Sequence, residues 1–203
     1  YRKENGHISK ASNSALSICN GNYIGFLDHD DTLSKHALLW TACEAKKNPK
    51  AQIFYSDEDK IDETGRYDGP YFKPDFSPEL FYSHNLITHF AVYKKKLVMK
   101  VKGFRSEFNG AQDYDFALRA LSYCGVKHVC HIPKILYHWR QHSGSTALDS
   151  GSKPYAMIAG EKALNQYFKK NKISYTAKHI GHAYKLSGSI PKILPKVSVI
   201  IPS

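Results

Sequence analysis

The stretch of the sequence that most suggests chemistry is Asp28-His29-Asp30-Asp31, which directly follows the apolar run 23–27. A short apolar run of this kind predicts a strand that is buried on both faces, as in a parallel sheet. Carboxylates at the end of such a strand repel one another unless a cation shares them, and Mg²⁺ and Mn²⁺ prefer carboxylate oxygens. The pattern therefore favours a divalent-metal site over the alternative, a solvated turn whose acids cap the next helix.

A second acidic group, Gln112-Asp113-Tyr114-Asp115, stands at the start of a predicted helix. Acids in a first helical turn interact favourably with the helix dipole, and this alone would explain them. The functional hypothesis makes one of them a general base, which must take a proton from a nucleophile within hydrogen-bond reach. The residues by themselves leave both explanations open.

A third polar stretch runs from His138 through Trp139 and Arg140 into a Ser- and Gly-rich segment that includes Ser143 and Ser145. Histidine can bind a metal, and an arginine guanidinium pairs with phosphate oxygens through a fork of donors. Ser- and Gly-rich loops offer backbone N–H groups to anions. The stretch is thus a candidate metal and phosphate site, and the alternative is a polar surface loop with an exposed aromatic residue.

Helices and short strands must position these groups, and hydrophobic periodicity with turn signals gives their expected ranges. We expect helices over residues 10–19, 35–46, 94–101, 112–124 and 154–170. We expect strands over residues 23–27, 51–55, 88–93, 126–131, 135–139, 173–179 and 182–187. The remainder of the segment 60–93 has the turn signals of a functional loop system.

The apolar residues of three helices predict which face each helix buries. Ser9 is the expected N-cap of the first helix. His84 and His89 are expected to be hydrogen-bonded structural residues, because neither belongs to a zinc-binding pattern. The expected buried stripes are Ile8, Ala11, Ala15 and Ile18 in the first helix, Tyr114, Ala117, Leu118 and Leu121 in the helix over 112–124, and Tyr155, Ile158, Ala159, Ala163 and Tyr167 in the helix over 154–170.

The order and spacing of these blocks resemble family-2 glycosyltransferases from residue 5 to about residue 170. Residues 5–16 are similar to the N-x-G-x-x-x-A-x-N-x-(A/G) motif of that family, and residues 21–31 follow its G-x-Y-(I/V)-x-F-L-D-x-D-D motif. Four further blocks look like a bacterial polysaccharide-assembling branch of the family, namely Tyr55–Asp59, Phe72–Asp75, Gln112–Asp115 and Tyr137–Arg140.

The resemblance implies a GT-A fold, an α/β architecture in which helices flank a mixed sheet. It also implies an inverting transfer of a sugar from a nucleotide-diphospho-sugar donor. The expected acceptor is a growing surface or cell-wall polysaccharide or a lipid-linked saccharide. A metal that offsets charge on the leaving diphosphate and a single base would suffice for this chemistry.

Site residues can be transferred from the family only where its motifs match this sequence. The D-x-D motif falls on Asp28 and Asp30, which would hold Mn²⁺ or Mg²⁺ against the diphosphate, while Asp31 is better explained as structural. The (E/Q)-D motif makes Asp113 the base that deprotonates the acceptor hydroxyl. The remaining implied contacts are His138 for the metal or diphosphate and Arg140, Ser143 and Ser145 for the diphosphate.

The sequence departs from the family pattern at its beginning. The family opens with a strand of the V-S-(V/I)-I-I-P type, a helix and a second strand that grip the base and ribose, and none of these precedes Tyr1. The only such strand is Val197–Ser203, at the other end of the chain. We therefore expect residues 1–189 to be a partial GT-A domain that lacks its first β-α-β segment. Residues 190–203 are expected to be a linker and the first strand of a following transferase domain.

This departure predicts an N-terminally truncated piece of a longer, tandem-domain protein. Such a piece would have an incomplete nucleotide site and would be inactive alone. The strand over 197–201 could also pair with a vacant sheet edge, in its own chain or in a second copy, which would give self-association through the C-terminal strand.

Composition limits the partners and the location of the protein. The formal net charge is +11, from 29 Lys and Arg against 18 Asp and Glu, and 42% of the residues are hydrophobic, which excludes a disordered composition. The charge suits an anionic substrate or peripheral contact with an anionic membrane surface. No nucleic-acid-binding motif occurs, so we expect no nucleic-acid partner. The four Cys lack zinc or redox spacing, so we expect reduced thiols in a cytoplasmic protein, at the inner face of the membrane.

Two other function classes use similar residues. A metal-dependent phosphohydrolase also clusters acids, but it would hydrolyse a nucleotide sugar without an acceptor. A non-catalytic carbohydrate- or nucleotide-binding module would keep donor and metal binding without transfer. The donor sugar, the base of the nucleotide and the roles of Asp57, Glu58 and Asp59 do not follow from the sequence.

Overall fold

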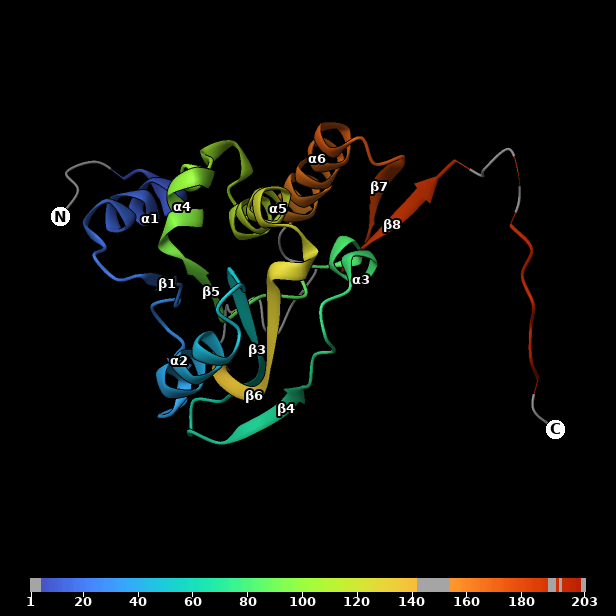
Figure 1. The fold of residues 1–203 in the computed structure, drawn as a ribbon. Coiled ribbons are helices and arrows are strands. Elements are labelled where there is room, and N and C mark those ends of the chain that lie inside the picture. The colour runs from blue at the N-terminus through green and yellow to red at the C-terminus, as the bar shows by residue number, and fades with distance from the viewer. Residues whose placement is uncertain (1–4, 142–153, 190–192, 194, 202–203) are drawn as a thin grey trace.

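The computed structural model describes residues 5–141, 154–189, 193 and 195–201. Its centre is a mixed sheet with the strand order β1-β5-β3-β6-β2, in which β4 also pairs with β3 (Figure 1). The strands are β1 (Tyr23–Gly25), β2 (Thr32–Leu33), β3 (Ile53–Ile61), β4 (Tyr67–Tyr71), β5 (Ala91–Lys94) and β6 (Val129–Arg140), and a separate hairpin is formed by β7 (Tyr175–Ile180) and β8 (Ala183–Gly188).

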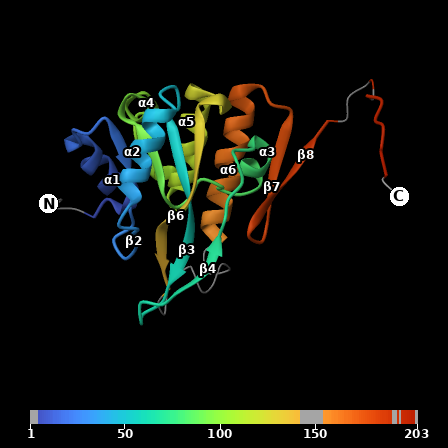
Figure 2. The ribbon, with the colours of Figure 1, turned by 60° about the horizontal axis from the view of Figure 1, so that its bottom comes forward.

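Helices cover both faces of the sheet. Figures 1 and 2 show α4, α5 and α6 on one side and α2 on the other, and each side has its own apolar core. None of the helices in the described part of the chain combines the length and apolar composition of a membrane span. The α-helices are α1 (His7–Ile18), α2 (Ala37–Lys47), α3 (Pro78–Ser83), α4 (Lys95–Val101), α5 (Gln112–Cys124) and α6 (Pro154–Asn171), and the 3-10 helices are η1 (Ser106–Phe108) and η2 (Val126–His128).

The central strand β3 is longer than the sequence predicts. The expected strand ends at Tyr55, but β3 continues through Asp57, Glu58 and Asp59 to Ile61. It pairs in parallel with β6 and antiparallel with β5 and β4. Acids are usually depleted in strands, yet each of these three finds a partner within the fold, and those partners offset the cost of burial.

Strand β6 is one strand where the sequence predicts two. The two expected segments flank Pro133, which lacks the N–H that a ladder needs. The β3–β6 register shifts there, because Ser56 pairs with Ile132 whereas Asp57 pairs with Ile135. A bulge therefore accommodates the proline, and the strand resumes beyond it.

Strand β1 is not the doubly buried parallel strand that its apolar run predicts. It has three residues, pairs antiparallel with β5, and forms the end of the strand order. Only Ile24 of the three is buried, while Tyr23 remains 37% exposed. The physical reason is that no strand among the described residues pairs with its other edge.

Helix α1 buries the face opposite to the predicted one. Ile8 and Ile18, from the expected stripe, are 45% and 78% exposed. Ser9 is fully buried rather than being the N-cap, and its hydroxyl donates to Asn109 Oδ1 at 2.5 Å. Asn13 bonds both the N–H and the carbonyl of Phe104 at 2.8 Å. Polar contacts with the segment before α5, together with packing of Leu16 against the core, thus set the rotation of α1.

The second half of the chain agrees more closely with the sequence. Helix α5 has the expected bounds, and its whole expected stripe is buried. Helix α6 buries Ala163 and Tyr167 as expected, but Tyr155 and Ile158 are 55% and 56% exposed. The β7–β8 hairpin matches the two predicted strands. Residues 195–201 form no strand with β1 of their own chain and are exposed, so pairing with a second copy stays a prediction.

Candidate active site

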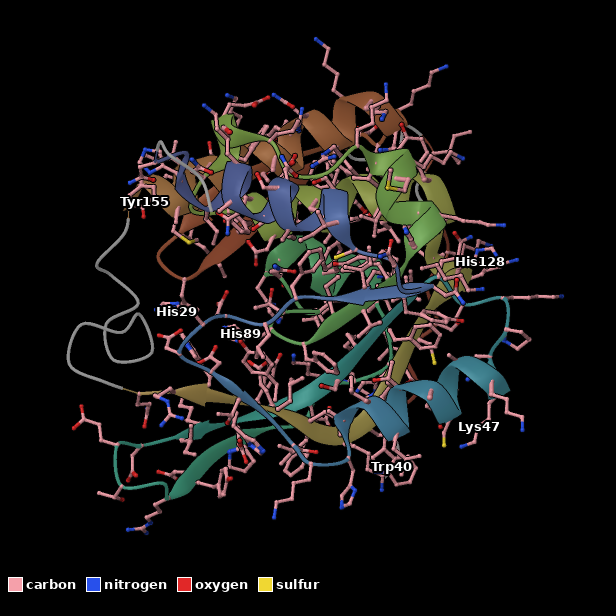
Figure 3. The ribbon with its side chains drawn as sticks, turned by 90° about the vertical axis from the view of Figure 1, so that its left-hand side faces the viewer. His29, Trp40, Lys47, His89, His128 and Tyr155 are labelled. Atoms are coloured by element: carbon pink, nitrogen blue, oxygen red, sulfur yellow. The ribbon has the colours of Figure 1, made fainter. Side chains whose placement is uncertain are left out.

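A cavity of about 890 Å³ lies where β1, the segment 85–89, the start of α5 and the outer half of β6 meet. Asp28 lines it from the end of β1, and Asp113 lines it from the first turn of α5. Figure 3 shows His29 and His89 on this side of the molecule. The fold thus brings two of the sequence-predicted site residues to one cleft, at a sheet edge of the kind where α/β proteins bind ligands.

The Asp113 carboxylate is oriented by two neutral donors. Asn85 Nδ2 donates to Asp113 Oδ2 at 2.9 Å, and the Thr88 hydroxyl donates to the same oxygen at 3.1 Å. Oδ1 has no hydrogen-bond partner within the described ranges, so it can accept a proton from a group in the cleft. The sequence did not identify Asn85 or Thr88, because a single amide and a single hydroxyl in a loop form no motif.

Asp28 lies in a field of negative charge. Burial raises the pKa of its carboxyl group, and the carboxylates of Asp31, Asp113 and Asp30 raise it further, while His89 opposes them. A divalent cation bound beside Asp28 would relieve this repulsion. The charge pattern at the end of β1 therefore fits a divalent metal.

Asp31 has the structural role that the sequence favours. It is buried, and it accepts hydrogen bonds from the Tyr137 hydroxyl and from the Arg140 N–H, the latter at 2.8 Å. Burial and the Asp31 carboxylate raise the pKa of Tyr137 far above its ordinary value. Asp31 therefore ties the acidic turn to β6 and leaves Asp28 as the acid that faces the cleft.

Arg140 and His138 both lie on β6 beside the acidic turn. Arg140 Nε donates to the Asp30 carbonyl at 2.7 Å, which fixes the guanidinium next to the predicted metal site. His138 Nδ1 contacts Asp59 Oδ1 at 2.5 Å, and its ring lies against that of Tyr67. A metal-binding histidine usually has a carboxylate hydrogen-bonded to its other ring nitrogen. Asp59, whose role the sequence left unassigned, is in the position to support His138 in this way.

The predicted ligands do not form a closed metal cage. Asp28 lines the cleft but Asp30 and His138 do not, and the described residues contain no cluster of three or more His, Cys, Asp or Glu side chains placed to bind a metal. Mg²⁺ and Mn²⁺ commonly keep water and substrate phosphate as ligands, so an open carboxylate site fits them. The predicted diphosphate contacts Ser143 and Ser145 lie outside the described residues.

A buried ionic network supports the segment that holds Asp113. Lys73 Nζ, which is fully buried, lies 2.8 Å from Glu58 Oε2 and also donates to the Thr88 carbonyl. Glu58 accepts from the His89 N–H at 2.7 Å and contacts His89 Nδ1 at 3.1 Å. Burial raises the pKa of Glu58, but His89 and Lys73 outweigh it and hold the pKa at about 2. His89 is thus hydrogen-bonded, as expected. The network also reaches Asp113, because Thr88 accepts from Lys73 through its carbonyl and donates to Asp113 through its hydroxyl.

The other unassigned acid and the other structural histidine also have partners. Asp57 Oδ1 lies 2.7 Å from His131 Nε2 and accepts from the Lys73 N–H at 3.0 Å. His84 Nε2 lies 3.1 Å from the Tyr71 hydroxyl, as its structural prediction requires. None of these residues lines the cleft, so their contacts stabilise the fold rather than the site.

Comparisons with known proteins agree with this architecture. The family model described as "Glycosyl transferase family 2" matches residues 1–102. The solved structure of S. aureus TarS 1–349 in complex with UDP-GlcNAc superposes with a TM-score of 0.52 at 16% identity, covering 81% of this chain and 54% of that one. At this identity the likeness shows the fold alone, which is GT-A.

Two curated relatives are similar over nearly the whole chain. The protein named "Uncharacterized protein y4gI", from Sinorhizobium fredii, is 41% identical over 206 aligned positions, which cover 100% of this chain and 23% of the relative. "O-antigen biosynthesis protein RfbC" from Myxococcus xanthus is 33% identical, over 97% of this chain and 15% of the relative. The chain therefore spans less than a quarter of the length of these relatives.

Proposed function

The chain belongs to glycosyl transferase family 2, and on this premise we propose that its cleft transfers a sugar, with inversion, from a nucleotide-diphospho-sugar to a saccharide acceptor. The acceptor is a growing surface or cell-wall polysaccharide or its lipid-linked precursor. The similarity to a relative named for O-antigen biosynthesis supports this acceptor class. The four cysteines, which are free thiols, support a reducing cytoplasmic location.

The observation that carries the proposal is the oriented carboxylate of Asp113 across the cleft from Asp28. Asp113 Oδ1 takes the proton of the acceptor hydroxyl as that oxygen forms a bond to the anomeric carbon of the donor. The bond from that carbon to the diphosphate breaks in the same step, and the diphosphate leaves with the electron pair. One displacement at one carbon inverts its configuration, and a single base is sufficient for it.

The residues around Asp28 would hold Mn²⁺ or Mg²⁺. Asp28 and Asp30 would supply carboxylate oxygens, and His138, supported by Asp59, would supply a ring nitrogen. When bound, the metal would offset the negative charge of the leaving diphosphate. Arg140, which is fixed beside Asp30, and the loop with Ser143 and Ser145 are the proposed diphosphate contacts.

The domain organisation expected from the sequence is part of the proposal. Residues 1–189 would be part of a GT-A domain, and residues 190–203 would lead into a following domain. Support comes from the exposed Ile8 and Ile18 of α1 and from the edge of β1, which has no paired strand among the described residues. A further β-α-β unit packed there would bury these side chains and complete the nucleotide site, and the chain without it would be inactive.

The substitution Asp113→Asn in the full-length protein tests the catalytic assignment. The amide keeps the shape of the side chain but cannot accept the proton, so we expect transfer to fall about 10²–10⁴-fold. Donor and metal binding, measured by calorimetry, should stay near wild type. The matched control is Asp68→Asn, which changes an exposed acid of β4 and should leave both quantities unchanged.

Other outcomes would identify the alternative functions. Near-normal transfer by Asp113→Asn would exclude Asp113 as the base. Release of nucleotide diphosphate at the same rate with and without acceptor would indicate a phosphohydrolase. Donor binding by the wild type without transfer to any acceptor would indicate a binding module.

A further inference from the structure

One face of the molecule carries lysines from three helices and no acid. It is formed by α4, by the C-terminal ends of α5 and α6, and by η2. Helix α5 lies beside α4 and α6 (Figures 1 and 2), and η2 directly follows α5 along the chain. No Asp or Glu occurs in residues 80–106, 116–135 or 162–189. We name it the lysine face, and its exposed lysines are Lys96, Lys100, Lys127, Lys169, Lys170 and Lys172.

Contacts around Tyr123 place lysines of α4 and α6 on one surface. Lys100 Nζ of α4 lies 4.9 Å from the centroid of the Tyr123 ring, and Lys170 Nζ of α6 lies 5.1 Å from it. Asn171 Nδ2 of α6 also donates to the Ser122 hydroxyl of α5 at 2.9 Å. The ring of Tyr123 is therefore flanked by two ammonium groups that belong to different helices.

The charge of this face is not compensated within the described residues. Two acids that follow α4 along the chain, Glu107 of η1 and Asp115 of α5, are bound by arginines: Arg105 contacts both, and Arg119 Nη2 lies 2.7 Å from Asp115 Oδ2. None of the six lysines forms an ion pair with a carboxylate in the part of the chain that the structure describes. The face therefore presents a single-sign positive field to its surroundings.

Apolar side chains stand among the lysines. Met99 is 61% exposed, Tyr123 is 42% exposed and Val126 is 43% exposed. Solubility alone would explain exposed lysines, but it does not explain apolar side chains between them. A tyrosine with flanking lysines is typical of protein surfaces that bind at the lipid headgroup layer. There the ring enters the interface and the ammonium groups contact phosphates.

The lysine face lies away from the cleft. Asp113 is in the first turn of α5 and Tyr123 is near its end, so they are separated by roughly 15 Å along the helix axis at about 1.5 Å per residue. Figure 3 shows His29 and Tyr155, which line the cleft, on one side, and His128, next to Lys127, on the other. A flat surface against the lysine face would leave the cleft open to substrates.

We propose that the lysine face is a docking surface for an anionic lipid bilayer. Lysines within a Debye length of such a bilayer are attracted by its negative surface potential, while Tyr123, Met99 and Val126 enter the headgroup layer. The attraction is additive over the lysines, so it is strong only where several of them approach the membrane together. The proposal does not depend on the sugar-transfer chemistry of the cleft.

Vesicle co-sedimentation of the 203-residue chain tests this proposal. We expect binding to vesicles of phosphatidylglycerol and phosphatidylcholine, and none to phosphatidylcholine alone. The triple variant Lys100→Glu, Lys127→Glu, Lys170→Glu should weaken binding by at least about tenfold, because it reverses three charges at the membrane surface. The matched control is Lys35→Glu, Lys178→Glu, Lys185→Glu, which makes the same charge change at exposed lysines before α2 and on the β7–β8 hairpin and should keep most of the binding.

A second variant separates lipid insertion from charge. Tyr123→Ser keeps every lysine, and it should weaken binding to anionic vesicles several-fold while leaving binding to a soluble polyanion, dextran sulfate, unchanged. Circular dichroism of each variant should match the wild type. The proposal is overturned if the wild type ignores anionic vesicles, if the control triple variant loses as much binding as the test variant, or if Tyr123→Ser has no effect on vesicle binding.

Discussion

At the scale of single residues, the site depends on how each carboxylate is partnered. Asp31 is bound by Tyr137 and by the Arg140 N–H, so it is part of the scaffold. Asp113 is held by neutral donors, which orient it without neutralising its charge. Burial and neighbouring carboxylates raise the pKa of Asp28, and a bound cation would stabilise its ionised form.

This difference predicts how the protein responds to divalent metal. Adding Mn²⁺ should raise the melting temperature, because a cation bound by the folded state alone stabilises it by mass action. Asp28→Asn should remove most of that increase, since it deletes the carboxylate at the centre of the repulsion. The readout is calorimetry with and without Mn²⁺, and Asp68→Asn is the control that should respond like wild type. An unchanged response of Asp28→Asn would place the metal elsewhere.

At the scale of elements, long-range hydrogen bonds outweigh local apolar patterns. Helix α1 turns its polar face inward because Asn13 binds Phe104 before η1 and Ser9 binds Asn109 after it. Strand β3 keeps three acids because Lys73 and three histidines lie beside them. In both cases the hydrogen-bond partners are far apart in the sequence, so no local sequence pattern predicts the contacts.

The inverted rotation of α1 predicts two opposite mutational responses. In this chain, Ile8→Lys with Ile18→Lys should change the free energy of unfolding by no more than about 0.5 kcal/mol each, because both side chains are exposed. Asn13→Ala should cost about 1–3 kcal/mol, because it leaves both polar groups of Phe104 unpaired. Urea denaturation measures both.

The same isoleucine substitutions test the proposed domain organisation. In the full-length protein they should destabilise the transferase domain well beyond their effect in this chain, because a packed β-α-β unit would bury them. Equal effects in both proteins would show that no such unit covers α1.

At the scale of the whole molecule, the sheet separates two apolar cores, and the length of α5 separates the cleft from the lysine face. The cleft opens at the start of α5, and the lysine face lies near its end. The network of Glu58, Lys73 and His89 joins the central strand to the wall of the cleft, so it couples global stability to the geometry of Asp113.

Glu58 should therefore dominate the acid sensitivity of the fold. Its pKa in the folded protein, about 2, lies below its ordinary value of 4.5, so its ionised form stabilises the protein above about pH 4.5 and this contribution is lost as the pH falls toward 2. The contribution is on the order of 3 kcal/mol. Urea denaturation at about pH 5 and about pH 2.5 should show a larger loss of stability for wild type than for Glu58→Gln.

A control variant shows whether the loss of stability at low pH is specific to Glu58. Glu63→Gln changes an exposed acid on the turn after β3 and should lose stability like wild type over the same range. If Glu58→Gln is as acid-sensitive as wild type, the stability at neutral pH does not come from this network.

The sequence by itself determined the family, the α/β class and the bounds of α5, and it predicted a structural role for Asp31 and site roles for Asp28 and Asp113 that stay predictions. These depend on local information: an apolar run that ends in acids, a helical period, and the order of motifs along the chain. It also predicted a metal site at Asp28 and Asp30 and a phosphate role for Arg140, which the geometry accommodates and experiments must test.

Only the tertiary structure decided which groups meet. It turned α1 over, extended β3 through the acids that had no assigned role, joined two predicted strands across Pro133, and placed Asn85 and Thr88 on Asp113. It also brought lysines of two helices, Lys100 of α4 and Lys170 of α6, to the ring of Tyr123. The physical reason for the buried contacts is the same in each case: a buried polar group must find a partner, and that partner can stand anywhere in the chain.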